Sequence, residues 1–577
     1  MKKSIPLHLR HFTAQQHYNA YSPIDHAVWR YVMRQNHHFL EDIAHDAFTS
    51  GLKSSGISID SIPRVSEMND HLDKIGWGAV IVDGLIPGTA FFDFQAHGIL
   101  PIATDIRQKT NIEYTPAPDI LHEAAGHAPI LFDETYSEFV KLIGNIGANA
   151  FATKEEHEVF EAIRHLSIVM ESPASTEEEI EAAKQRLKEK QHLVKGLSEA
   201  EQISRIFWWT VEFGLIGDLQ KPKIFGAGLL SSVGESKHSL SDQVKKRLFT
   251  IEDAINTSYD VTSMQTQLFV CESFEQLIEE VTRFGESMAF RQGGTVAIEK
   301  AIASSKVAHI EFNSGIQITG LFTDIMKDAE GEAIYVKTSG PSALSIQNEQ
   351  INHHGPDIHN DGFGAPIGKL AGGIKLENQS EQSLKKLGIE INKMMQITFE
   401  SGVEISGHVK NLLFNHDTLV LISLEECLVK KREEILFHPT WGTYDLAVGS
   451  QIVSARPIAA DYAAYHGESV INEEESPKEG TTLTPLEELY AEVRQIRDTN
   501  FSQDVLLHSV IGKILDEFPE EWLLQLEVLE LLEKHDKESP LKKLLLDQLE
   551  KLSREERYVR LIQNGLDVIF GRRNVKV

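Results

Sequence analysis

The spacing of apolar residues changes its period twice along the chain, and this change constrains the fold more than any other feature. Up to about residue 290 apolar side chains recur at helical spacing, from the Ser-Pro start at 22–23 to a last amphipathic helix at 273–290. From residue 308 they alternate with a period of two, and helical spacing returns beyond the acidic stretch 472–482. A chain of 577 residues is too long for one ordinary domain. We therefore predict a multidomain protein, with a mostly α domain over 1–295, a β-rich domain over 300–465 and a small helical domain over 482–577.

The β-rich region contains an internal repeat. The segments "IEFNSGIQITG" (310–320) and "ITFESGVEISG" (397–407) match at most positions, and each places Ser-Gly between two alternating runs. Two copies are too few for a solenoid, so we predict a duplicated β domain packed as a sandwich or barrel. In the α domain, residues 150–200 indicate a helical insertion, because 176–192 is too charged to be buried.

Charge and cysteine content narrow the class of protein. Lysine and arginine number 56 against 86 acidic residues, and this net charge of −30 disfavours nucleic acid and anionic membranes as partners. Only Cys271 and Cys427 are present, too few for a disulfide framework or a thiolate metal site. No stretch approaches the roughly 20 apolar residues of a spanning helix. We expect a cytoplasmic protein that does not enter a membrane.

Two histidines five residues apart, in "PDILHEAAGHAPILF" (118–132), suggest a metal site. Helix residues follow one another at about 100°, so His122 and His127 would diverge by about 140° on a regular α-helix. Either the helix ends between them or one ligand lies in a turn that Gly126 permits. A structural role, with hydrogen bonds among these side chains and Glu123, remains equally possible at this point.

A buried carboxylate favours a metal site over a purely structural role for these histidines. Glu212 lies within "FWWTVEFGL" (207–215), where an unpaired charge among aromatic side chains would be costly. Two imidazoles and one carboxylate form the facial triad of non-haem Fe(II), although zinc accepts the same ligands. The loop "GAGLLSSVGE" (226–235) favours backbone contact with a small ligand. The stretch "NHHGPDIHND" (352–361) could be a second metal site, but its irregular spacing favours a plain polar loop.

Four stretches together resemble the signature segments of the pterin-dependent aromatic amino acid hydroxylases. They are "YTPAPDILHEAAGH" (114–127), "WWTVEFGL" (208–215), "GAGLLSS" (226–232) and "QTQLFVCESFE" (265–275). The resemblance covers about residues 20–290 and implies the mostly α catalytic fold of that family. It also implies that His122, His127 and Glu212 hold Fe(II).

The resemblance extends to substrate and cofactor contacts. It implies that Arg107 pairs with the carboxylate of the amino acid, that Thr115 and Ser231 contact the same substrate, and that Trp208 packs its ring. In the segment "VDGLIPGTAFF" (82–92), Gly84 and Leu85 would offer backbone hydrogen bonds to the pterin and Phe91 would stack on it. Glu123 would approach the pterin through water.

The expected activity is hydroxylation of an aromatic L-amino acid with Fe(II), O2 and a reduced pterin, a tetrahydropterin. Phenylalanine giving tyrosine is the leading expectation, and tryptophan or tyrosine is the alternative substrate. More distant alternatives are a zinc hydrolase with Glu123 as general base and a non-catalytic binding protein. Residues 300–577 are expected to be dispensable for chemistry and to mediate self-association or contact with another protein. The reason is that apolar side chains such as Leu524, Val528 and Leu531 need a partner surface.

Overall fold

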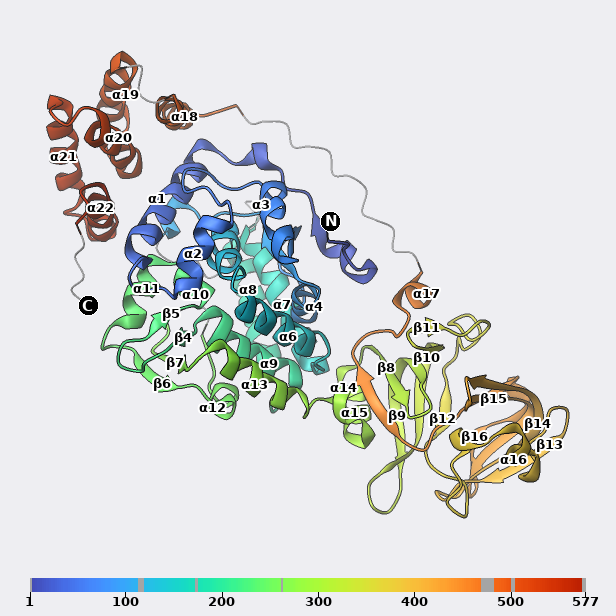
Figure 1. The fold of residues 1–577 in the computed structure, drawn as a ribbon. Coiled ribbons are helices and arrows are strands. Elements are labelled where there is room, and N and C mark those ends of the chain that lie inside the picture. Colours follow the sequence, from blue (N-terminus) through green and yellow to red (C-terminus); the bar gives the residue numbers. More distant parts are fainter. Residues whose placement is uncertain are drawn as a thin grey trace.

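The computed structural model describes residues 3–82, 84–112, 119–171, 175–260, 263–467, 482–499 and 504–572. A helical N-terminal region fills the centre of the molecule, two β-sheets extend from one end, and the C-terminal helices lie against the other end (Figure 1). The N-terminal region opens with helix α1, Pro23–Leu40, where Ser22 and Asp25 form a capping box and Pro23 takes the first position. A second helix, α2, follows at Asp46–Ser54.

The further helices of this region surround two small sheets. Their bounds are α3 Val65–Leu72, α4 Gly88–Ala96, α5 Ala128–Ile130, α6 Glu134–Ala148, α7 Lys154–Glu171, α8 Glu177–Gln191, α9 Glu199–Phe207, α10 Ala227–Leu230, α11 Val233–Leu240, α12 Ile251–Asn256, α13 Phe274–Gly285, α14 Ala289–Gln292 and α15 Gly294–Ser304. Two π-helices, η5 (His122–His127) and η6 (Trp208–Glu212), and four short 3-10 helices complete the set: η1 Leu7–Phe12, η2 Tyr18–Ala20, η3 Asp73–Ile75 and η4 Lys109–Asn111. Most of these elements share one hydrophobic core.

The two small sheets are short and mixed. One has the order β1-β2-β3, with strands Thr13–Ala14, Gly78–Val82 and Ile99–Ala103, and its last two strands are parallel. The other has the order β5-β4-β7-β6, with strands Lys223–Ile224, Leu215–Ile216, Gln267–Cys271 and Lys245–Leu248. The apolar run at 78–82, which interrupts the helical pattern of the sequence, is therefore strand β2.

The predicted insertion contains a helical hairpin. Helix α8 begins at a capping box formed by Thr176 and Glu179, and most of its side chains are exposed. It packs against α7, where Lys190 forms an ion pair with Glu158 at 2.7 Å. The charged pattern thus corresponds to a helix that leaves one face in solvent.

Two larger sheets follow helix α15. The first has the order β11-β10-β9-β8-β18, with β12 also paired to β10; its strands are β8 Val307–Phe312, β9 Ile316–Lys327, β10 Ala333–Ile346, β11 Glu349–Gln350, β12 Gly364–Pro366 and β18 Ile452–Arg456. The second has the order β13-β14-β15-β16, with β17 paired to β15; its strands are β13 Met394–Thr398, β14 Val403–Asn415, β15 Thr418–Lys431, β16 Glu434–Phe437 and β17 Tyr444–Ala447. Short helices η7 (Leu376–Asn378), α16 (Glu381–Lys386), η8 (Pro439–Trp441) and α17 (Tyr462–His466) lie between or after the strands.

The repeated sequence segments form matching hairpins in these two sheets. The turn from β8 to β9 contains Gly315 with φ +90°, and the turn from β13 to β14 contains Gly402 with φ +79°. Both turns need the left-handed backbone that glycine adopts without strain. Each sheet contributes to its own cluster of buried apolar side chains, and helix α15 covers the first sheet.

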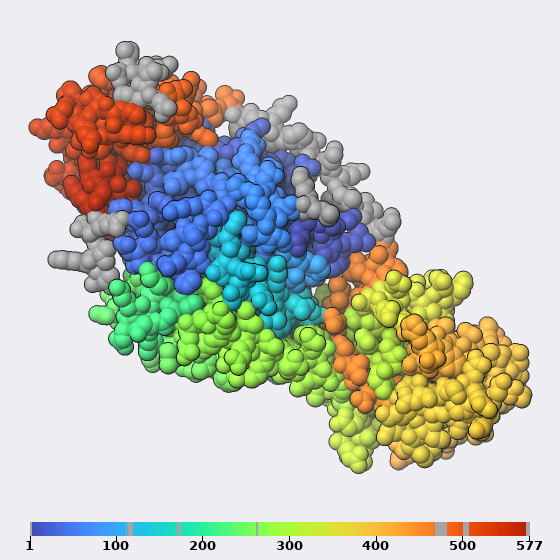
Figure 2. Space-filling view, viewed as in Figure 1, coloured from blue at the N-terminus to red at the C-terminus, as the bar shows by residue number. Residues whose placement is uncertain are grey.

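The C-terminal helices pack on the N-terminal region of the same chain. They are α18 Pro485–Asp498, α19 Asp504–Glu517, α20 Trp522–His535, α21 Pro540–Leu552 and α22 Glu556–Ile569, and α18, α20 and α22 contact α1 (Figure 1). In the space-filling view their red surface lies directly against the blue N-terminal residues (Figure 2). Leu524, Val528 and Leu531 are buried in the core cluster that contains the residues of α1. The apolar stripe therefore finds its partner within the chain, and it gives no ground for the self-association that we expected from it.

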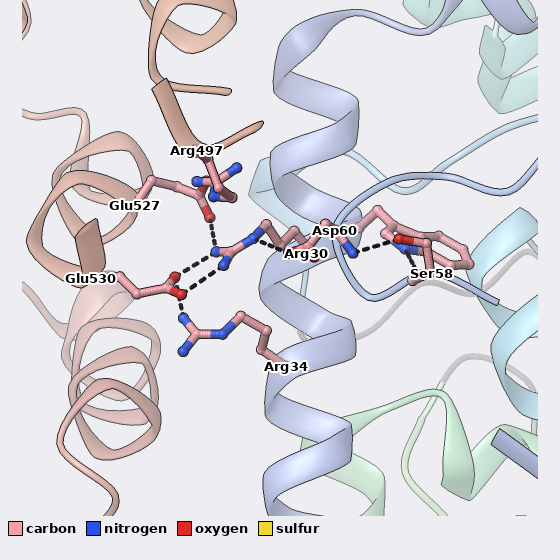
Figure 3. Close-up of polar contacts among 8 residues, drawn as sticks. Arg30, Arg34, Ser58, Asp60, Arg497, Glu527 and Glu530 are labelled. Atoms are coloured by element: carbon pink, nitrogen blue, oxygen red, sulfur yellow. Dashed lines mark hydrogen bonds and ion pairs between the residues drawn. The ribbon is translucent and has the colours of Figure 1, made fainter. Parts of the chain in front are cut away.

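Polar contacts reinforce this packing. Arg30 on α1 bonds to Glu527 and Glu530 on α20 (Figure 3). The Tyr31 hydroxyl donates to the carbonyl of Leu561 on α22. Lys109, two residues beyond Arg107, forms an ion pair with Glu521 at 2.5 Å. None of the described helices is long and apolar enough to span a membrane.

Candidate metal centre

His122 and His127 lie on one π-helical turn inside a longer helix. Helical residues continue on both sides of η5, from Ile120 to Ile130, and the Ala128 N–H donates to the carbonyl of Glu123, five residues back. A π-turn places residues five apart above one another, so both imidazoles point the same way. The expectation that the helix ends between them, or that one lies in a turn, is therefore wrong. The helix widens instead.

Gly126 is needed for close packing rather than for a turn. Its φ is not positive, but a Cβ on this residue would lie 2.7 Å from the carbonyl oxygen of Ala227. Real Cβ atoms do not approach a backbone oxygen so closely, so helix α10 could not pack here against any other residue. Glycine thus lets the widened turn and α10 meet.

Glu212 reaches the same point from a second π-helix, η6. The Phe213 N–H donates to the carbonyl of Trp208, again five residues back, at 2.9 Å. Glu212 Oε2 lies 3.2 Å from His122 Nε2, and Glu212 Oε1 lies 3.2 Å from His127 Nε2. The two Nε2 atoms are 3.1 Å apart. All three side chains are more than four-fifths buried.

These separations fit a single metal ion. Neighbouring donors bound at about 2.1 Å and at right angles lie about 3.0 Å from each other. Two ring nitrogens at 3.1 Å cannot both carry a proton, so at least one lone pair faces the other ring. Burial alone would raise the pKa of Glu212, but the adjacent imidazoles lower it, so this carboxylate is ionised. Anionic and neutral donors that converge in a buried site are suited to a divalent cation.

Ser231 orients His122. Its hydroxyl donates to the carbonyl of Ala227 at 2.8 Å, and His122 Nδ1 lies 3.0 Å from the Ser231 Oγ atom. Because the only hydroxyl proton is engaged, Ser231 accepts from Nδ1–H, and this leaves the Nε2 lone pair for a metal. The sequence placed Ser231 near the substrate and did not reveal this partner.

The glycine-rich stretch 226–235 is mainly helical and supports the centre. It forms α10 and the start of α11, which contradicts the open loop that we expected. A Cβ on Gly226 would lie 2.5 Å from the Glu212 carbonyl oxygen, and one on Gly228 would lie 3.0 Å from it. The two glycines therefore allow α10 to press against the end of η6, next to the carboxylate ligand.

Glu123 lies beside the three donors without joining them closely. Its Oε2 is 3.9 Å from His127 Nε2, farther than either Glu212 oxygen, and has no hydrogen-bond partner among the described residues. Burial raises its pKa to about 8. Glu212 is thus the nearer carboxylate to both imidazoles.

Arg107 lies close to the centre with one edge of its guanidinium occupied. Nε and Nη2 donate to the two carboxylate oxygens of Asp119 at 2.8 and 3.0 Å, and Nη1 makes a long bond of 3.3 Å to the Ser231 carbonyl. Burial would raise the pKa of Asp119, but Arg107 outweighs this and lowers it. Asp119 thus engages Nε and Nη2, whereas Nη1 makes only the long bond to Ser231.

Aromatic side chains form one wall near the centre. Phe213 stacks on Trp208 at 4.7 Å, and Tyr259 stacks on it at 4.4 Å. Tyr259 was not predicted, because nothing in its surrounding sequence distinguishes it. Phe91, on α4, contacts Phe207 edge-on at 5.5 Å, whereas Gly84 and Leu85 are exposed in the preceding loop. Thr115 lies outside the described residues.

Comparisons with known proteins agree on one family. The model of the biopterin-dependent aromatic amino acid hydroxylases matches residues 9–170 and 192–309. The interruption between these two ranges includes helix α8. Phenylalanine-4-hydroxylase of Chromobacterium violaceum is 28% identical over 270 residues, which cover 46% of this chain and 76% of that protein. Tyrosine 3-monooxygenase of Canis lupus familiaris is 28% identical over 240 residues, 41% of this chain and 39% of that protein.

A solved structure of the Chromobacterium violaceum phenylalanine hydroxylase, described as holding oxidised Fe(III), is also similar. It is 27% identical, covers 47% of this chain and 84% of that chain, and has a TM-score of 0.38.

The site and the family match together define an aromatic amino acid hydroxylase. Over residues 9–170 and 192–309 the chain belongs to the biopterin-dependent aromatic amino acid hydroxylase family. This family membership supports hydroxylation rather than a zinc hydrolase or a non-catalytic binding protein.

Proposed function

We propose that the protein hydroxylates phenylalanine to tyrosine, with Fe(II), O2 and a tetrahydropterin. The observation that carries this proposal is the convergence of His122, His127 and Glu212 at 3.1–3.2 Å inside the segment that matches the family. Phenylalanine is favoured as substrate because several relatives are named phenylalanine-4-hydroxylase.

The three donors would hold the iron on one face and leave its other positions open. Once bound, the iron and the reduced pterin would supply the activation of O2. The residues of the chain keep the geometry: Ser231 holds the His122 tautomer through Nδ1, and the two π-turns aim the donors inward. Burial excludes water from the carboxylate, so its attraction for a cation is not screened.

The side chains around the three donors would bind the amino acid and the pterin. Arg107 would bind the carboxylate of the amino acid with the edge that Asp119 leaves open, and Trp208 would pack its ring. Phe91 would stack on the pterin, with Gly84 and Leu85 offering backbone groups and Glu123 a buried carboxyl. Thr115 is proposed as a further substrate contact.

The proposal extends to the organisation of the chain and to its partners. We take residues 1–295 as the catalytic domain, 300–465 as a duplicated β domain and 482–577 as a helical domain. A net charge of −30 supports small-molecule partners rather than nucleic acid or membrane, and a cytoplasmic location.

Product analysis tests the proposed reaction. Purified full-length protein, loaded with ferrous iron, is supplied with tetrahydropterin, O2 and each aromatic amino acid in turn. We expect tyrosine from phenylalanine, at a kcat/KM above that for tryptophan or tyrosine, and no product without the pterin. A higher kcat/KM for another amino acid would reassign the substrate. Absence of any pterin-dependent product would contradict the proposed function.

Replacing Arg107 by lysine should weaken binding of the amino acid much more than binding of the pterin. The ammonium group of lysine lacks the planar fork of the guanidinium, so it cannot form paired parallel hydrogen bonds to a carboxylate. Loss of one charged hydrogen-bond pair costs about 1.5–3 kcal/mol, which corresponds to about 10–100-fold in kcat/KM. The KM for the pterin should change by about twofold at most.

Asp119→Asn separates this role from a purely structural one. It weakens the bond that orients Arg107 but keeps the guanidinium, so its effect on the KM for the amino acid should be smaller than that of Arg107→Lys. Equal increases in the KM for both substrates in Arg107→Lys would show that Arg107 does not hold the amino acid.

A further inference from the structure

A second group of metal-binding side chains lies in the β-rich region, far along the chain from the first. We propose that His354, His359 and Asp445 bind a divalent transition-metal ion of the zinc class, which links the two large β-sheets. The three side chains place a nitrogen or oxygen donor within 4.8 Å of one another. The expectation of a plain polar loop at 352–361 is thus wrong in one respect, because the fold does bring two of its histidines together.

The backbone of strand β10 holds both histidines in place. The Leu344 N–H donates to the carbonyl of His354 at 2.9 Å, and the Ser342 N–H donates to the carbonyl of His359 at 3.0 Å. Because these donors are two residues apart on one strand, they lie on the same edge of β10. The loop after β11 is therefore pinned at the two residues that carry the imidazoles, whose rings are nearly parallel with centroids 5.8 Å apart.

Asp445 comes from the other sheet and is already oriented. It lies on β17, directly opposite Ser423 on β15, and the Ser423 hydroxyl donates to its Oδ1 at 2.5 Å. Its Oδ2 lies 3.2 Å from His354 Nδ1 and 3.6 Å from His359 Nε2. One carboxylate oxygen is thus held by a hydroxyl while the other faces both rings, as in many metal sites with supporting hydrogen bonds.

The facing nitrogens lack hydrogen-bond partners. His354 Nδ1 and His359 Nε2 are buried, and neither makes a hydrogen bond to any described residue. Both nitrogens instead approach the same atom, Asp445 Oδ2, so the three donors converge on one place. Buried polar atoms are normally hydrogen-bonded, and two buried imidazole nitrogens that share one carboxylate oxygen form a donor set suited to a cation.

The donor set suits zinc. Two imidazoles and a carboxylate are typical zinc ligands, and three protein ligands leave one position for water. The side chains of His354 and His359 are 14% and 9% exposed, so an ion can reach the site from solvent. The histidines lie in a loop bonded to the first sheet, and Asp445 lies in the second sheet. A bound ion would therefore bridge the two sheets.

Counting bound metal in the full-length chain tests the proposal. Metal-free protein is equilibrated with Zn²⁺, and bound zinc is measured after gel filtration. The wild type should bind two equivalents and Glu212→Ala one, while Glu212→Ala combined with His359→Ala should bind none. His353→Asn is the matched control, because His353 is an exposed neighbour with φ +65° that asparagine tolerates, and it should bind as the wild type does.

Two further variants test whether the loss of zinc comes from the loss of a ligand rather than from unfolding. Asp445→Asn preserves the shape of the side chain and should also lose one equivalent, and its circular dichroism in the metal-free state should match the wild type. Ser423→Ala should weaken zinc binding at this site by about 10–100-fold. If Glu212→Ala binds no zinc, or if His359→Ala and Asp445→Asn retain two equivalents, the second site does not exist. Because the readout is metal content, failure of the hydroxylation assay would leave this result unaffected.

Discussion

Replacing Glu212 by alanine is expected to abolish both iron retention and hydroxylation. The carboxylate supplies the only anionic donor within 3.2 Å of both His122 and His127 in the described part of the chain. Loss of a hydrogen-bond partner of a ligand already weakens metal binding by about 10–100-fold, and loss of the ligand itself should exceed that. We therefore expect iron content to fall from about one atom per chain to near zero.

The fold of this variant should persist, because removing a buried charge also removes the need for its cation. Glu235→Gln is a matched control for iron content, since Glu235 is likewise buried but belongs to α11. It should keep its iron. Iron content unchanged in Glu212→Ala would show that the centre is built from other residues.

Replacing Arg30 by methionine should lower the free energy of unfolding of the protein more than any of the other substitutions described above. Arg30 is 5% exposed, and its guanidinium bonds to Glu527 at 2.8 Å, to Glu530 at 2.7 Å and to Asp60 at 2.8 Å (Figure 3). Without it, Glu527 and Glu530 stay in a largely buried interface between α1 and α20. Removing one partner of a buried ion pair costs about 3–5 kcal/mol. Arg34 and Arg497 also contact these carboxylates, so we expect about 3 kcal/mol.

Thermal unfolding and limited proteolysis measure this effect. The C-terminal helices should become accessible to protease at a lower temperature than in the wild type, because their attachment to α1 is weakened. Arg283→Met is the control: the Arg283 side chain is 62% exposed, and its loss should change stability by about 0.5 kcal/mol at most. An Arg30→Met protein that unfolds like the wild type would mean that apolar packing alone attaches the C-terminal helices.

The same interface changes the expected role of the C-terminal region. The sequence suggested that everything after residue 300 was dispensable for chemistry, but Glu521 pairs with Lys109, close to Arg107 and the candidate substrate site. Tyr490 also donates to Glu521, at 2.7 Å. The C-terminal helices thus support the segment that carries Arg107, and their removal would expose the apolar face of α1.

Residue types and local periodicity were enough to predict the donors of the first centre and the regions of helix and strand. Two histidines, a glutamate among aromatic residues and their motifs were sufficient to predict a metal site and a family. Periods of 3.6 and 2 distinguished the helical regions from the β-rich one, because burial of one face imposes that spacing on any chain.

The way in which these residues meet depends on the packing of segments that are distant in sequence. The spacing argument for His122 and His127 assumed an α-helix, whereas the chain forms a π-turn there. The close packing of Gly126 against Ala227 is also not revealed by any local pattern. The hydrogen bond from His122 to Ser231 likewise joins residues that are distant in sequence.

The same holds for the second cluster and for the C-terminal helices. His354 and His359 have no regular spacing, and they meet Asp445 only because the loop that β10 holds lies next to β17 of the other sheet. The amphipathic pattern of α20 predicted that one face of the helix is buried. Because the hydrophobic effect is not specific for a partner surface, the pattern could not predict that α1 covers this face. The specific fit of α20 to α1 includes complementary charge, because Arg30 on α1 bonds to both Glu527 and Glu530 on α20.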